Sequence, residues 1–103
     1  MNVRDLEDAV RPAAKLLKAM CNGHRLLILC QLMDGEKRVG DLERRTGLSQ
    51  SALSQHLARL RRDGLVKTRR QAQAIYYALA GNDVDQVIAV LHRIFCGADA
   101  PAA

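Results

Sequence analysis

The sequence has few aromatic side chains, no long hydrophobic run and no closely spaced cysteines. Aromatic residues make up 3% of the 103 residues, without any Trp, which argues against a stacking platform for single-stranded nucleic acid. The longest uncharged apolar run, 26–33, is too short to cross a bilayer. The N-terminus has no pattern of a secretory signal. We therefore expect no membrane partner and a cytoplasmic location.

The pattern of potential catalytic groups also argues against an enzyme. Cys21, Cys30 and Cys96 are too far apart in the chain for a Cys-x-x-Cys redox motif or a zinc knuckle. No general base stands beside a cysteine, and no glycine-rich phosphate loop is present. A small thiol oxidoreductase or peroxidase is therefore disfavoured. We interpret the three histidines, His24, His56 and His92, as structural.

Length and charge indicate one domain that binds a polyanion. The size is that of a single domain, 1–103, which buries about 60–65% of its unfolded surface, so an oligomer is expected. Residues 36–70 carry ten basic and four acidic side chains, whereas 1–35 have a net charge of +1 and 71–103 of −2. Most of the basic residues are arginine, which favours forked contacts with phosphate or guanine over a merely solvated surface.

Apolar spacing predicts helices at both ends of the chain and a buried helix between them. The first covers about the first 20 residues, with Pro12 either opening a helix or kinking a longer one. Asn22 is a suitable N-cap for a helix over 24–33 that is apolar on nearly every face. The last helix, 83–95, has a broad apolar stripe and thin polar cover. We expect the first and last helices to form a symmetric dimer interface.

The centre of the chain has the pattern of a winged helix-turn-helix. A short helix over 39–46 ends at Gly47, and Ser49 caps a second helix that reaches about Asp63. Period-2 alternation then predicts two strands, 65–70 and 74–79, joined as a β-hairpin. The predicted fold is mainly α with a small β-hairpin, in the order α-α-α-α-β-β-α, forming a homodimer through the first and last helices.

The second helix of this motif has one apolar face and one face of small, polar and basic side chains. Leu53, Leu57 and Leu60 form the core stripe. An ordinary exposed face is the alternative, but Ser, Gln and Arg can hydrogen-bond base edges and phosphates of double-stranded operator DNA. The residues that we expect to contact DNA are Ser49, Gln50, Ser51, Ser54, Gln55, Arg59 and Arg62 on the helix, and Arg69, Arg70 and Gln71 on the wing.

Four runs of sequence resemble the ArsR/SmtB family of bacterial winged-helix repressors over residues 13–96. They are LKAM (17–20), HRLLIL (24–29), LSQSALSQHL (48–57) and LRRDGLV (60–66). Gly23 departs from the pattern, because the family often has Pro there. The resemblance implies a homodimer on palindromic DNA and often a metal sensor.

The family's usual metal ligands are incomplete in this sequence. Residues 38–42 lack the Cys-x-Cys of one family site. Asp83, Asp85 and His92 stand on the last helix without the second His and late carboxylate of the other. A zinc site needs about four converging ligands, so we expect no metal and no cofactor. A non-standard metal site, for example at Cys21, His24 and Cys96, or a thiolate-ligated haem remains an alternative.

The cysteines themselves leave a sensor role open, because Cys30 fits a core position while Cys96 is accessible at a helix end. Through LILCQL (27–32) and IFC (94–96), the sequence also resembles the branch of the family that senses persulfides and related reactive sulfur species. That branch pairs a cysteine on the second helix with one at the end of the last. By that resemblance, persulfide or polysulfide would crosslink Cys30 and Cys96 through a disulfide or a longer sulfur chain and release the operator. Cys21 has no assigned role.

Overall fold

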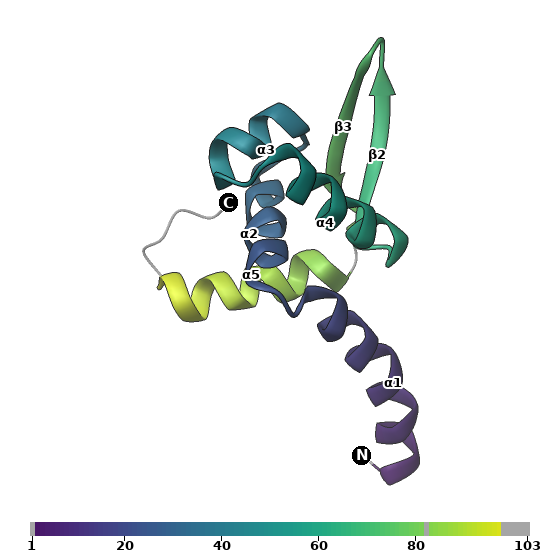
Figure 1. The fold of residues 1–103 in the computed structure, drawn as a ribbon. Helices are drawn as coiled ribbons and strands as arrows, with labels where there is room; N and C mark the ends of the chain where they lie inside the picture. The colour runs from purple at the N-terminus through teal and green to yellow at the C-terminus, as the bar shows by residue number, and fades with distance from the viewer. Residues whose placement is uncertain (1, 82, 98–103) are drawn as a thin grey trace.

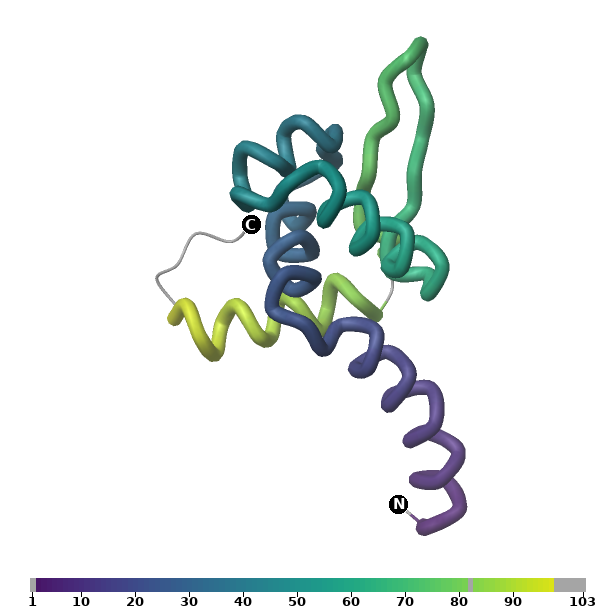
Figure 2. Tube along the Cα trace, viewed as in Figure 1, coloured from purple at the N-terminus to yellow at the C-terminus, as the bar shows by residue number. Residues whose placement is uncertain are grey.

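The computed structural model describes residues 2–81 and 83–97, which form helices and a small sheet in the predicted order (Figures 1 and 2). The elements are α1 (Val3–Met20), α2 (Gly23–Gln31), the 3-10 turn η1 (Leu32–Asp34), β1 (Lys37–Arg38), α3 (Val39–Thr46), α4 (Gln50–Arg62), β2 (Val66–Gln71), β3 (Ala74–Leu79) and α5 (Asp83–Cys96).

One hydrophobic core joins all five helices that the described residues form. The leucine stripe of α4 is buried as predicted, with Leu53 and Leu60 at 0% exposure and Leu57 at 1%. Helix α2 lies at the centre, in contact with α3, α4 and α5. The buried apolar residues are Ala19, Met20, Ile28, Leu29, Leu32, Leu42, Leu53, Leu57, Leu60, Leu65, Val66, Val84 and Ile88.

Helix α1 is continuous through Pro12 and projects away from the rest of the molecule (Figures 1 and 2). Its apolar side chains Val3, Leu6, Val10 and Leu17 are exposed. Its C-terminal end is held by the buried Arg25 of α2, whose Nε donates to the Ala19 carbonyl at 2.8 Å. A cation at this position also suits the negative end of the helix dipole.

Helix α2 is buried on one face only, which corrects the expectation of a helix buried on nearly every side. Ile28 and Leu29 are fully buried, but Leu27 is 38% exposed and Cys30 is half-buried. The helix ends at Gln31 and continues as η1. The prediction failed because an apolar sequence does not specify whether neighbouring elements cover each face of a helix. Leu26 and Cys30 of α2 border an open pocket beside α5.

The sheet has three strands in the order β1-β3-β2, all antiparallel. The β2–β3 hairpin is the predicted wing, and it extends away from the helices in Figure 1. Strand β1, of two residues, is an addition to the predicted order: Lys37 pairs with Tyr77, and Arg38 pairs with Tyr76. Among the described residues, no helix is long and apolar enough to span a membrane.

Candidate functional site

The N-terminal half of α4 presents a polar, accessible face. Ser49 is the N-cap, and its Oγ accepts a hydrogen bond from the backbone N–H of Ala52 at 3.1 Å. Because the hydroxyl proton remains available, this cap residue can still donate to a phosphate oxygen. Four of the other predicted contacts lie on exposed positions with uncommitted polar atoms. They are Gln50, Ser51, Ser54 and Gln55.

The two arginines predicted at the C-terminal half of α4 differ in availability. Asp63 lies 3.5 Å from Nε of Arg59 and 3.7 Å from Nε of Arg62. The Arg59 Nε is buried and has no hydrogen-bond partner among the described atoms, whereas the Arg62 side chain is 71% exposed. Arg62 can therefore reach a DNA backbone more freely than Arg59, whose guanidinium is partly held against the helix end.

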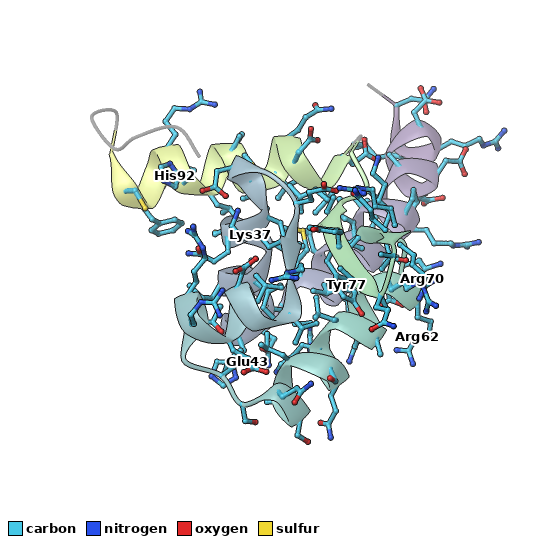
Figure 3. The ribbon with its side chains drawn as sticks, turned by 90° about the horizontal axis from the view of Figure 1, so that it is seen from above. Lys37, Glu43, Arg62, Arg70, Tyr77 and His92 are labelled. Atoms are coloured by element: carbon cyan, nitrogen blue, oxygen red, sulfur yellow. The ribbon has the colours of Figure 1, made fainter. Side chains whose placement is uncertain are left out.

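The wing residues are also unequal. The guanidinium of Arg69 pairs with the Glu36 carboxylate, donates to Gln71 Oε1 at 2.8 Å, and stacks 4.4 Å above the Tyr76 ring centroid. Arg70 is exposed and makes no hydrogen bond or ion pair within the described chain. In Figure 3, Arg70 and Arg62 lie toward the same side of the molecule, far from His92. On the wing, Arg70 is therefore available to contact DNA, whereas the Arg69 guanidinium is already bound to side chains of the same chain.

The thiols of Cys30 and Cys96 line one cavity of about 210 Å³ between α2 and α5. Cys96 is exposed, Cys30 is half-buried, and both are free thiols. Burial, and secondly the nearby Cys96, raise the pKa of Cys30 above the usual thiol range. The cavity's other lining residues are mainly apolar, namely Leu26, Ile88, Leu91, His92 and Phe95.

The structure thus brings together the two cysteines that the resemblance paired. Cys21 lies apart from them, exposed at the C-cap of α1. Within residues 2–81 and 83–97, no group of three or more His, Cys, Asp or Glu side chains is arranged to hold a metal ion. The alternative ligand set of Cys21, His24 and Cys96 is therefore not assembled.

Comparison with known proteins places this arrangement in a family. Residues 22–68 match the family described as "Bacterial regulatory protein, arsR family". The transcriptional activator HlyU of Vibrio cholerae is 54% identical over 96% of this chain and 92% of its own length. The chain belongs to the ArsR family.

Solved structures of similar transcriptional regulators agree with the fold. The transcriptional repressor BigR from Xylella fastidiosa superposes with a TM-score of 0.86 at 39% identity, covering 94% of this chain and 99% of that one. A homodimeric winged helix-turn-helix DNA-binding domain from Mycobacterium bovis gives 0.75 at 33% identity, over 91% of this chain and 86% of that one.

These relatives confirm the predicted fold class, with β1 as an addition. They are named as transcriptional regulators, and the ArsR chain described here is accordingly a transcriptional regulator and not an enzyme. The names include an activator and a repressor, so family membership alone does not fix the direction of regulation.

Two features of the site were not predicted from the sequence. One is Glu36, which lies 33 positions before its partner Arg69. The other is the contact between His24 and His56, which joins α2 to α4. Both contacts join residues that are remote in the sequence, and no local pattern predicts either of them.

Proposed function

We propose that this ArsR protein is a homodimeric repressor that binds operator DNA when reduced and releases it when persulfides crosslink Cys30 and Cys96. The observation that carries the proposal is the shared cavity: two thiols on different helices line one small apolar space. One of those helices, α2, packs directly against the helix proposed to read DNA.

The DNA-binding half of the proposal is supported by the exposed polar face of α4 and the basic wing. Gln55 and Ser54 are on the exposed side of α4, where side chains can hydrogen-bond base edges in a major groove. Arg62 and Arg70 flank that face with accessible positive charge, which suits the phosphate backbone.

A dimer is supported by the apolar surfaces left open on α1 and α5. Val10 on α1 is 58% exposed, and Ile94 and Phe95 on α5 are 63% and 79% exposed. Large apolar side chains that are exposed on the first and last helices are typical of a subunit interface. The homodimer of the Mycobacterium bovis relative is consistent with this arrangement.

The thiol chemistry follows from the different exposure of the two sulfurs. The exposed Cys96, as thiolate, attacks the outer sulfur of a low-molecular-weight persulfide RSSH, forming a Cys96 persulfide and releasing RS⁻. Cys30 then loses its proton to water and attacks Sγ of Cys96, expelling HS⁻. Two thiols and one RSSH thus yield a disulfide, RSH and hydrogen sulfide. Each further RSSH adds one sulfur to the bridge and leaves one more RSH.

Crosslinking would reach the DNA-binding helix through packing. Cys30 lies next to Leu29, which belongs to the same core as Leu53 and Leu57 of α4. A bridge to α5 restrains α2, and α2 cannot shift without disturbing that close-packed core. A typical coupling of about 1–3 kcal/mol would weaken operator binding about 5–150-fold.

The test is to treat the reduced protein with glutathione persulfide and to measure both intact mass and operator affinity. We expect an intramolecular bridge between Cys30 and Cys96 and weaker DNA binding in the wild type and in C21S, which is the matched control. Neither C30S nor C96S should form the bridge or release DNA. Persulfide treatment that leaves the operator affinity of the wild type unchanged would refute the sensor function.

A further inference from the structure

We infer that Glu36 is a positioning residue for DNA binding. Together with Tyr76, Glu36 holds the Arg69 side chain across the sheet and so fixes the wing, which leaves Arg70 to contact DNA. We call the Glu36–Arg69 pair, stacked on Tyr76, the strap. The inference rests on the proposed function, in which α4 and the wing bind the operator. It changes the role of Arg69, which the sequence predicts to be a direct DNA contact.

The first step is that the donors of Arg69 are largely committed within the protein. Its Nε lies 2.8 and 3.0 Å from the two carboxylate oxygens of Glu36, and one Nη also donates to that carboxylate. The other Nη donates to Gln71 at 2.8 Å. The face of the guanidinium covers the ring of Tyr76 at 4.4 Å. A forked pair of this kind has a defined geometry that a single lysine contact lacks.

The second step is that this cluster spans the whole sheet. Arg69 on β2 lies directly opposite Tyr76 on β3, and Tyr76 lies opposite Arg38 on β1. Glu36 immediately precedes β1, so its contact with Arg69 reaches from one edge strand across the central strand to the other. A two-stranded hairpin is marginal alone, and this contact ties its outer strand to the body of the protein.

The third step is that Glu36 stands on a fixed segment. The next residue, Lys37, is 8% exposed, and its Nζ lies 2.6 Å from Asp34 Oδ1 and 3.3 Å from the Gly35 carbonyl oxygen. Lys37 therefore anchors the turn that carries Glu36, so the strap is attached to the helical core at one end and to the wing at the other.

The fourth step is the charge that remains for DNA. Glu36 neutralises Arg69 locally, whereas Arg70 has no acidic partner among the described residues. Arg70 points to the opposite face of β2 from Arg69, because successive strand residues alternate. The wing's phosphate contact is thus assigned to Arg70.

The decisive experiment exchanges the two charges. The DNA is a palindromic duplex selected from a random-sequence library by the reduced wild-type protein, and affinity is measured by fluorescence anisotropy. We expect R69E and E36R to weaken binding, and the double variant E36R/R69E to return to within about two- to fivefold of the wild type. In the matched control, the double variant E36R/R70E should bind the duplex no better than R70E alone.

A second variant, E36Q, distinguishes the two roles of Arg69, because they predict changes in operator affinity of opposite sign. If Arg69 is a strap, E36Q lowers operator affinity even though it removes a negative charge from a DNA-binding protein. If Arg69 is instead a phosphate contact masked by Glu36, E36Q raises affinity. Both residues are exposed, and thermal unfolding of each variant confirms that it is folded.

Two outcomes would overturn the inference: an E36Q protein that binds DNA more tightly, or a charge-swapped protein that binds no better than R69E. Either can occur while the wild type binds its duplex normally, which leaves the proposed function intact. Failure of the reduced wild type to select any duplex would instead remove the proposed function, and the inference with it.

Discussion

The imidazole rings of His24 and His56 meet edge to face, with 5.7 Å between their centroids and 75° between their planes. His24 lies in the first turn of α2, and His56 lies in the middle of α4. Burial, and then the positive charges of Arg25 and His24, lower the pKa of His56 below its usual range. This contact joins α2 to α4, and the interpretation of His24, His56 and His92 as structural stays a prediction.

The first prediction concerns stability and pH. Because the pKa of His56 is lower in the folded protein than in the unfolded chain, its contribution to stability is present above about pH 6.5 and is lost as pH falls. We expect the urea midpoint to decrease between pH 7 and pH 5, and to decrease less in H56Q. A decrease in H56Q equal to that of the wild type would contradict the assignment.

The second prediction concerns the order of thiol reactivity. Since burial raises the pKa of Cys30 and Cys96 is exposed, iodoacetamide at neutral pH should modify Cys96 well before Cys30. Peptide mass spectrometry over time measures this order. Replacing the neighbour in C96S removes one cause of the raised pKa, so Cys30 should then react faster. Equal rates for the two thiols in the wild type would argue against the exposure that the proposed first step requires.

The third prediction separates base contacts from phosphate contacts on α4. Gln55→Ala should reduce the preference for operator over random duplex, with a loss of about 1–3 kcal/mol in discrimination. Arg62→Ala should weaken both duplexes alike and lower the salt dependence of binding by about one counterion. The measurement is anisotropy across a salt series. A Gln55→Ala protein with unchanged discrimination would remove that residue from the contact surface.

The fourth prediction concerns the dimer. A charge at Val10 would lie in the proposed α1–α5 interface, so Val10→Glu should shift the protein toward monomer and weaken DNA binding. Arg4→Glu introduces the same side chain at a polar position of α1 and serves as control. Analytical ultracentrifugation of both variants gives the result. If Val10→Glu stays dimeric at the concentrations where the wild type does, α1 does not form the interface.

Local patterns in the sequence were sufficient to predict the helices and the wing. Gly47, with φ of +73°, ends α3, and the N-cap Ser49 begins α4. Both signals act locally, so the sequence shows them. Long-range pairing was not predictable in this way. Strand β1 is too short for a periodic signal, and it forms only because β3 is available beside it.

The same contrast between local patterns and long-range pairing applies to the candidate site. The exposed positions of α4 follow from helical periodicity and are found where expected. The pairing of Cys30 with Cys96 came from family resemblance, because nothing in the spacing of two remote cysteines predicts a shared cavity. The partner of Arg69 could not be inferred at all, since Glu36 belongs to a segment whose position depends on the buried Lys37.

The position of the cavity has a consequence for engineering. Its lining comes from α2 and α5, and it includes none of the side chains proposed to touch DNA. Under the proposed function, a different pair of ligating or reactive residues facing this cavity would change the small molecule that releases the operator, while the side chains proposed to contact DNA stay the same.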